Sequence, residues 1–161
     1  MNVLIDTNVL SEVKRPAPDR KVLAWLDALD EDRAFISVAS IAELWRGIAL
    51  MEEGRRRTAL AVWLAQDLPA RFVGRILPID PSIAERWGDL MAQARKGGFA
   101  LSVMDGFFAA TGLTNDLMLA TRNTKDFAPL GVPTFNPWTD GDKTGLAPLP
   151  ACRMPLRLRP S

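Results

Sequence analysis

Four short apolar runs, separated by helical patterns, constrain the fold of this 161-residue chain more than any other feature. The runs are residues 3–6, 34–38, 75–79 and 117–121. Between them, apolar residues recur at amphipathic-helix spacing, as in 40–54, 55–68 and 101–114. Short buried strands that alternate with helices predict an α/β fold of three layers, in which helices flank a central parallel sheet of four to five short strands. Residues 132–135 could add an edge strand, where a proline is tolerated.

The chain is predicted to form one domain. Its length suffices for one well-filled core and is too short for two ordinary domains. The domain is expected to occupy residues 1–140. Residues 141–161 contain four Pro and three Arg and lack a periodic apolar pattern, so we expect them to form a poorly ordered tail.

Two absences exclude whole classes of chemistry. The sequence has no His, which rules out Ser-His-Asp and Cys-His catalysis and His zinc sites. The single Cys, Cys152, rules out disulfide frameworks and Cys zinc clusters and suits a reducing cytoplasm. No apolar run reaches the roughly 18 residues of a membrane span, so we expect a cytoplasmic protein. Any chemistry must use carboxylates, amides, hydroxyls, Lys or Arg, with a borrowed metal ion as the natural partner.

Acidic and amide side chains fall where such a sheet would hold a ligand. Asp6 ends the first apolar run and Asn123 follows the fourth. Glu43 lies early in the helix after the second run, and Asp105 near the start of the helix before the fourth. In open parallel sheets ligands bind beyond the carboxyl ends of the strands, so these side chains are expected to converge there. Their mutual repulsion would be relieved by a hard cation such as Mg²⁺ or Mn²⁺, which prefers oxygen ligands.

Each of these acids also has a purely structural interpretation. Asp6 could cap the helix that begins near residue 8, because Asp is a favoured N-cap. Ser40-x-x-Glu43 and Ser102-x-x-Asp105 both match the capping box. However, Glu43 and Asp105 stand among apolar, small and aromatic residues, where an unpaired carboxylate is costly to bury. That context favours a functional role for both.

Five sequence blocks, taken in order, resemble one family. "LIDTNVLSE", "SVASIAELWRG", "SVMDGFFAAT", "LATRNTKDF" and "FNPW" are similar to the motifs of the PIN-domain family, and in particular to the VapC/FitB-type toxins of type II toxin–antitoxin systems. The resemblance extends from about residue 2 to residue 140. "DTN" alone is a weak signal, whereas all five blocks together are specific.

The resemblance implies a Mg²⁺- or Mn²⁺-dependent ribonuclease. Carried over by motif, Asp6, Glu43 and Asp105 are the expected catalytic residues and metal ligands. The family's fourth acid commonly falls in the block that here places Asn123, an amide without charge, which puts a second metal ion in doubt. Asp126, three residues on, is interpreted as a solvated turn residue. The expected supporting residues, which would orient ligands or water, are Thr7, Asn8 and Thr121.

The expected reaction is hydrolysis of an RNA phosphodiester by a metal-activated water. Arg46 and Arg122 are candidates for phosphate contacts, and a solvated surface position is an equally good interpretation of each. The net charge of +1 provides no broad field for nucleic acid, so such contacts must be local. By resemblance, the expected partners are the RNA substrate, a VapB/FitA-type antitoxin and a second copy of the chain in a homodimer.

Two other functions remain open from the sequence. The substitution at Asn123 is compatible with a non-catalytic PIN-like module that only binds RNA or protein. A receiver-like phosphoacceptor domain is also α/β with Mg²⁺ at strand ends, but it needs adjacent acids near the first strand and a Lys after the last. This chain has Asn2 and Asp6 there, and the next Lys is Lys143. A haloacid-dehalogenase-type phosphatase needs an Asp where Asn8 stands.

Overall fold

Five parallel strands form the centre of the computed structural model, which describes residues 1–141. The sheet has the order β3-β2-β1-β4-β5, and every neighbouring pair is parallel. This confirms the predicted α/β class. Apart from Gly141, the predicted tail lies outside the described residues. The strands are β1 (Val3–Ile5), β2 (Ala34–Ser37), β3 (Ile76–Leu77), β4 (Met118–Ala120) and β5 (Thr134–Phe135).

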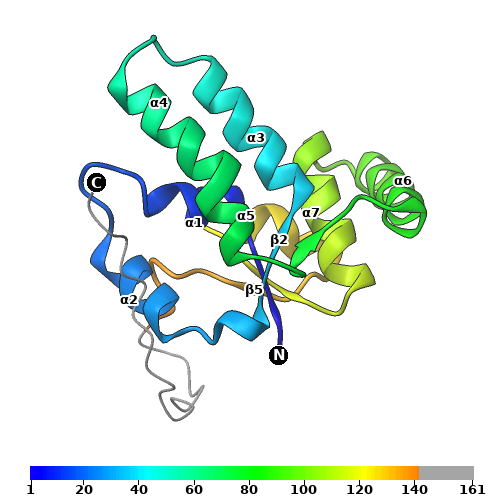
Figure 1. The fold of residues 1–161 in the computed structure, drawn as a ribbon. Helices are drawn as coiled ribbons and strands as arrows, with labels where there is room; N and C mark the ends of the chain where they lie inside the picture. The colour runs from blue at the N-terminus through cyan, green and yellow to red at the C-terminus, as the bar shows by residue number, and fades with distance from the viewer. Residues whose placement is uncertain (142–161) are drawn as a thin grey trace.

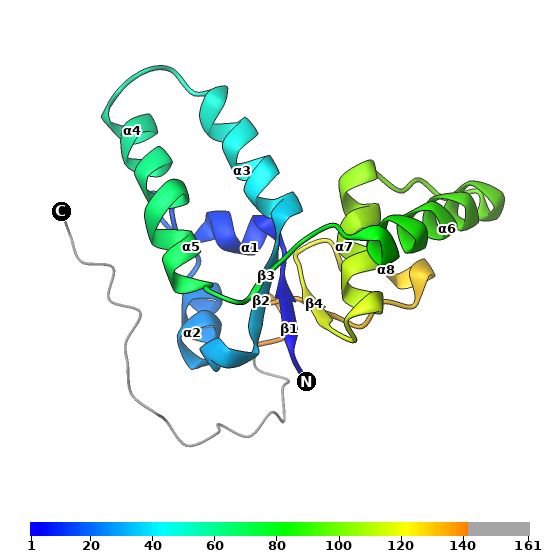
Figure 2. The same cartoon turned by 45° about the vertical axis from the view of Figure 1, so that its right-hand side comes forward.

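Helices cover both faces of this sheet (Figures 1 and 2). Figure 2 shows α1, α2 and α5 on one side of the sheet and α6, α7 and α8 on the other, while α3 and α4 project together as a hairpin. The bounds are α1 (Thr7–Glu12), α2 (Arg20–Ala28), α3 (Val38–Ala49), α4 (Arg55–Val62), α5 (Leu68–Arg71), α6 (Pro81–Gly97), α7 (Val103–Thr114) and α8 (Thr124–Phe127). A π-helical turn, η2 (Trp63–Asp67), joins α4 to α5, and short 3₁₀ turns occupy η1 (Glu31–Arg33) and η3 (Ala128–Leu130).

The strands bury side chains on both faces, which explains why the strand segments read as continuous apolar runs. Successive residues of a strand point to opposite faces. In β1, Val3 and Ile5 join one core with helices α1, α2, α4 and η2, whereas Leu4 joins a second core with α6 and α7. The two cores make the sheet the middle layer of three, as predicted.

Helix α3 begins earlier than the sequence pattern predicts. Ser37, the last residue of β2, is its N-cap, and the Ser37 hydroxyl accepts a hydrogen bond from the Ala39 N–H at 3.0 Å. The capping box predicted at Ser40 is therefore wrong, because the strand end supplies a cap one turn sooner. Ser40 is fully buried inside the helix, where its hydroxyl accepts a hydrogen bond from the Thr7 hydroxyl at 3.0 Å.

The predicted end of this helix is also wrong. α3 ends at Ala49, and Gly54 precedes α4 instead of closing α3. By contrast, Ser102 does cap α7, since its hydroxyl accepts a hydrogen bond from the Asp105 N–H at 3.1 Å. The helix cap predicted at Ser102 is therefore confirmed.

The strand order argues against the receiver-like alternative. Receiver domains have the doubly wound order 2-1-3-4-5, in which strand 1 lies second from one edge. Here β1 lies at the centre, between β2 and β4. Among the helices in residues 1–141, none has the length and apolar character needed to cross a membrane.

Candidate active site

Asp6 occupies the junction between β1 and α1. Its backbone N–H donates to the Ala120 carbonyl at 3.0 Å, which extends the β1–β4 pairing by one residue. It is also the N-cap of α1, and its Oδ1 accepts a hydrogen bond from the Thr7 N–H at 2.6 Å. The capping interpretation of Asp6 is therefore confirmed, and it leaves the second carboxylate oxygen available for other contacts.

The second oxygen of Asp6 is held by two side chains. Oδ2 accepts hydrogen bonds from the Thr121 hydroxyl at 2.6 Å and from the Asn8 amide at 3.1 Å. Thr121 is fully buried, and its oxygen in turn accepts the Asn123 N–H at 3.1 Å. Residues just after β1 and β4 therefore form one hydrogen-bonded unit around Asp6.

Burial of Asp6, which is only 5% exposed, raises its pKa from the ordinary 3.8 to about 6. The hydrogen bonds from Thr121 and Thr7 favour the charged form and oppose this rise in pKa. The negative charges of Asp105 and Glu43 add to it. Both of the other acids predicted to act with Asp6 are thus close enough to influence its pKa.

Glu43 and Asp105 reach the site from helices instead of strand ends. Both are half-buried, Glu43 on α3 and Asp105 in the first turn of α7. Burial raises the pKa of Asp105, the hydrogen bond with Ser102 lowers it, and the charge of Asp126 raises it further. Neither acid has the dense set of donors that surrounds Asp6.

These side chains surround one pocket of about 350 Å³ at the carboxyl end of the sheet. The structure thereby brings together all four residues predicted as metal ligands, with Thr7 and Asn8 beside them and Thr121 behind Asp6. The lining residues are Asp6, Thr7, Asn8, Ser11, Glu43, Asp105, Phe108 and Asn123.

The oxygen atoms that line this pocket suit a hard divalent cation. They are carboxylate, amide and hydroxyl oxygens, which Mg²⁺ and Mn²⁺ prefer. Within residues 1–141, no three His, Cys, Asp or Glu side chains are already gathered closely enough to hold one ion by themselves. A cation here would therefore draw on a mixed set of protein oxygens and water, as Mg²⁺ commonly does.

Asp126 lies nearer to the site than its interpretation as a solvated turn residue implies. It belongs to the first turn of α8, a helix for which Asn123 is the N-cap residue. Although Asp126 is exposed, its charge helps to raise the pKa of Asp105. Its exposure agrees with the interpretation of Asp126 as solvated, but the residue lies in a helix and not in an irregular turn. The spacing of three residues from Asn123 is the signal that could have placed Asp126 in a helical turn beside it.

The two arginines proposed for phosphate contact lie outside the pocket lining. Arg46 is exposed on α3, one turn after Glu43. Arg122 follows Thr121 directly, and its guanidinium carbon lies 5.0 Å from the centre of the Trp138 ring. Arg122 therefore stands at the rim of the site with a defined neighbour, whereas Arg46 makes no hydrogen bond, ion pair or ring contact with any residue that the structure describes.

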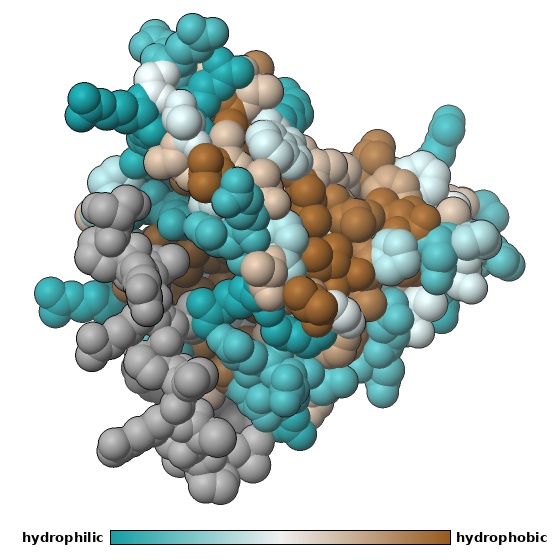
Figure 3. Space-filling view, in the orientation of Figure 1, coloured by the Kyte–Doolittle hydropathy of each residue, from teal (hydrophilic) through white to brown (hydrophobic). Residues whose placement is uncertain are grey.

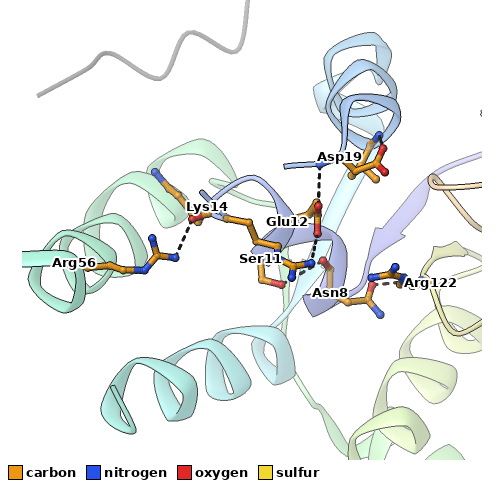
Figure 4. A network of polar contacts seen from close by, with 9 residues as sticks. Asn8, Ser11, Glu12, Lys14, Asp19, Arg56 and Arg122 are labelled. Carbon is orange, nitrogen blue, oxygen red and sulfur yellow. Dashed lines mark hydrogen bonds and ion pairs between the residues drawn. The ribbon is translucent and has the colours of Figure 1, made fainter. Parts of the chain in front are cut away.

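The far end of α1 is anchored by a carboxylate that the sequence pattern did not reveal (Figure 4). Glu12 is 4% exposed and accepts hydrogen bonds from the Asp19 N–H at 2.9 Å and from Arg15 at 3.3 Å. The Arg56 guanidinium from α4 donates to the Lys14 carbonyl at 3.3 Å. These bonds hold α1, and with it Thr7 and Asn8, against neighbouring helices.

Comparison with known proteins agrees with this geometry. The PIN domain family matches residues 3–131. The chain is 40% identical to VapC ribonuclease Y4jK of Sinorhizobium fredii over 136 residues, covering 84% of this chain and 97% of that protein. It is 39% identical to Toxin FitB of Neisseria gonorrhoeae over 138 residues, covering 86% and 99%.

A solved structure has the same fold. The crystal structure of FitAcB from Neisseria gonorrhoeae superimposes with a TM-score of 0.81 at 39% identity, covering 85% of this chain and 99% of that one. By sequence and by fold, this chain belongs to the PIN-domain family and resembles its VapC and FitB toxins over almost their whole length.

Proposed function

We propose that this chain is the toxin of a type II toxin–antitoxin pair and acts as a Mg²⁺- or Mn²⁺-dependent ribonuclease. The observation that carries the proposal is the pocket shared by Asp6, Glu43 and Asp105 at the carboxyl end of the sheet. The relatives named as a VapC ribonuclease and as a toxin support both halves of the proposal.

The residues divide the chemistry between them. Asp6, Glu43, Asp105 and the Asn123 amide would hold the cation. When bound, Mg²⁺ or Mn²⁺ supplies a water of lowered pKa and neutralises charge on the phosphate. Thr121, Thr7 and Asn8 keep Asp6 in one orientation through the hydrogen bonds already described. One of the three carboxylates would also accept the proton of the attacking water.

The proposed macromolecular partners follow from the same assignment. RNA is the substrate, and Arg46 and Arg122 are proposed to contact its phosphates from the rim. A toxin requires a partner that keeps it inactive in its own cell, so an antitoxin of the VapB/FitA type is proposed.

A second copy of the chain is also proposed, as a homodimer. Apolar side chains gather on the face seen between α3 and α6 (Figure 3). A shallow depression of about 540 Å³ lies on α6 and the segment that follows it, lined mainly by apolar residues such as Met91, Phe99 and Leu101. Apolar surface of this kind is typical of protein contacts.

RNA cleavage by the purified chain, free of antitoxin, tests the ribonuclease assignment. Structured RNAs are incubated with Mg²⁺, Mn²⁺ or EDTA, and Asp6→Asn and Asp105→Asn are compared with the wild type. Cleavage should require the metal and fall by at least about a hundredfold in both variants. Asp32→Asn, an exposed acid in η1 at the opposite end of the sheet, should cleave as the wild type does.

A non-catalytic binding module is the second candidate function. It is favoured by Asn123, which brings no charge to the position of the fourth acid. Undiminished cleavage by Asp6→Asn would refute the assignment of that residue. RNA binding by the wild type, without cleavage in either metal and without metal binding in calorimetry, would establish the binding module instead.

A further inference from the structure

We infer that Trp138 serves as a platform that positions Arg122 to bind a phosphate of the RNA strand at the rim of the acidic pocket. The inference rests on the proposed ribonuclease function and extends it, because it assigns a role to Trp138 and distinguishes Arg122 from the other cations near the site. The observation behind it is the stacking of the Arg122 guanidinium on the Trp138 ring, with 5.0 Å between the guanidinium carbon and the ring centre.

The backbone of Arg122 is held on both sides by residues of the site and of the β5 end. Its N–H donates to the Asn8 side-chain oxygen at 3.4 Å (Figure 4), and its carbonyl accepts from the Asn136 amide at 3.4 Å. Asn8 lines the pocket and donates to Asp6. The position of Arg122 is therefore tied to the acidic cluster through a single intervening side chain.

Trp138 is itself fixed in place. Its backbone N–H donates to the Asn136 side-chain oxygen at 3.0 Å. The Asn136 backbone N–H donates to the Asp140 carboxylate at 3.0 Å, and the two bonds close a tight turn after β5. One side of the Trp138 side chain packs against the core that contains Val3. Because the ring is already fixed, the guanidinium can stack on it without the entropy cost of ordering the ring as well.

The guanidinium of Arg122 is left free to bind an anion. Arg15 and Arg71 form ion pairs with Glu12 and Glu31, but Arg122 has no carboxylate within ion-pair distance among residues 1–141. It is exposed, and none of its side-chain N–H groups donates to another described residue. A planar guanidinium with its donors unused matches the two oxygens of a phosphate.

The charge of the whole chain leaves phosphate binding to local cations. A net charge of +1 cannot attract RNA over a distance, and the pocket itself carries carboxylates that repel phosphates. A stacked arginine beside the pocket offsets that repulsion where the strand must pass. Phosphate is therefore the ligand that fits Arg122 best.

Binding of a fluorescein-labelled single-stranded RNA to the full chain in EDTA, followed by anisotropy over a range of KCl concentrations, tests the inference without cleavage. Arg122→Gln should weaken binding by about three- to tenfold, the loss of one charge-assisted contact. The slope of log affinity against log salt should fall in magnitude by about 0.7, the value for one phosphate on a single strand. Arg33→Gln, at the opposite end of the sheet before β2, should bind RNA as the wild type does.

A double-mutant cycle tests the role of Trp138. Trp138→Leu should weaken binding in the wild type and have no further effect in Arg122→Gln, while Trp138→Phe should retain most of the affinity. Thermal unfolding of each variant identifies losses that are due to misfolding. Wild-type binding and salt slope in Arg122→Gln, additive effects in the cycle, or no RNA binding by the wild-type chain would each overturn the inference. RNA binding that depends on Arg122, without any cleavage in Mn²⁺, would instead contradict only the ribonuclease proposal.

Discussion

The acidic pocket has two walls that are built in different ways. On one wall Asp6 follows a central strand, is 5% exposed, and accepts hydrogen bonds from Thr7, Thr121 and Asn8. On the other wall Glu43 and Asp105 are half-buried side chains on α3 and α7. Glu43 makes no side-chain hydrogen bond to any other residue in the part of the chain that the structure describes.

The difference shows what each wall contributes. A carboxylate tied to the sheet and to three donors keeps one orientation, and it bears the desolvation that raises its pKa. Carboxylates on helix surfaces can adjust when a cation or a phosphate arrives. Under the proposed function, the strand-end wall would provide a fixed metal ligand, and the helical wall would provide ligands that adapt to the cation. The following predictions test that division.

The largest expected effect concerns the stability of the metal-free protein with changing pH. A raised folded-state pKa means that the folded form binds more protons than the unfolded form between about pH 4 and pH 6, so Asp6 lowers the free energy of unfolding as pH rises through this range. In EDTA, Asp6→Asn should remove that loss. Relative to that of the wild type, the free energy of unfolding of the variant should rise by up to about 3 kcal/mol between pH 4 and pH 7.

Urea denaturation at several pH values measures this difference. Asp105→Asn should show a change of the same sign and smaller size, because Asp105 is less buried. Equal pH dependence of unfolding in the wild type and in Asp6→Asn would mean that burial does not raise the pKa of Asp6.

A smaller effect is expected from crowding the helical wall at Gly106, the residue after Asp105. A Cβ atom there would lie 2.8 Å from both the Trp87 Nε1 and the Met91 sulfur, and Trp87 is held by its bond to the Val103 carbonyl at 3.0 Å. Gly106→Ala should therefore cost about 1–3 kcal/mol of stability. It should also move Asp105 and reduce cleavage while the pH response of Asp6 persists.

Gly88→Ala is the matched control for this prediction. Gly88 lies in α6, and a Cβ atom there would meet nothing within 4 Å. The substitution should stabilise the protein by about 0.5–1 kcal/mol, because alanine favours the helix interior. If Gly106→Ala were equally stabilising in thermal denaturation, the close packing of α6 on α7 would not position Asp105.

The smallest expected effect is on metal affinity at Asn123. Asn123→Asp adds a charge to the pocket at an exposed position, and the attraction between two opposite unit charges about 4 Å apart in water is worth about 1 kcal/mol, so Mn²⁺ should bind about fivefold tighter in calorimetry. Asn2→Asp, exposed before β1 at the other end of the sheet, should leave Mn²⁺ affinity unchanged. Weaker Mn²⁺ binding in Asn123→Asp would indicate that the amide, and not a carboxylate, is what the cation requires there.

Local sequence patterns predicted the helices and strands well where only one interpretation of the pattern was possible. The four apolar runs became strands because both faces of the sheet are buried. The start of α3 was misplaced because two serines compete for the same cap, and Ser37 at the strand end wins over Ser40. The residue at which β2 stops pairing with its neighbours decides which serine caps the helix. A local sequence pattern does not show where that pairing ends.

The candidate site could be predicted as a set of residues but not as a geometry. Asp6 and Asn123 stand out in the sequence because they follow apolar runs, and Glu43 and Asp105 because they lie near the starts of helices beside such runs. Asp126 and Glu12 did not stand out, since a charged residue in a helix is usually a solvated one. Their roles depend on neighbours distant in the sequence, Asp105 for the first and Asp19 for the second.

The sequence by itself determined the fold class and the absence of His and thiol chemistry from the described domain, because these follow from residue types and their periodicity. The resemblance of its five motif blocks indicated the family. Only the tertiary structure decided that Asp6 is buried with a raised pKa, that its second oxygen belongs to Thr121 and Asn8, and that Arg122 rests on Trp138. The physical reason is that desolvation and hydrogen-bond partners are properties of three-dimensional neighbours. Asp6 and Thr121 are 115 residues apart in the sequence, and the pairing of β1 with β4 brings them together.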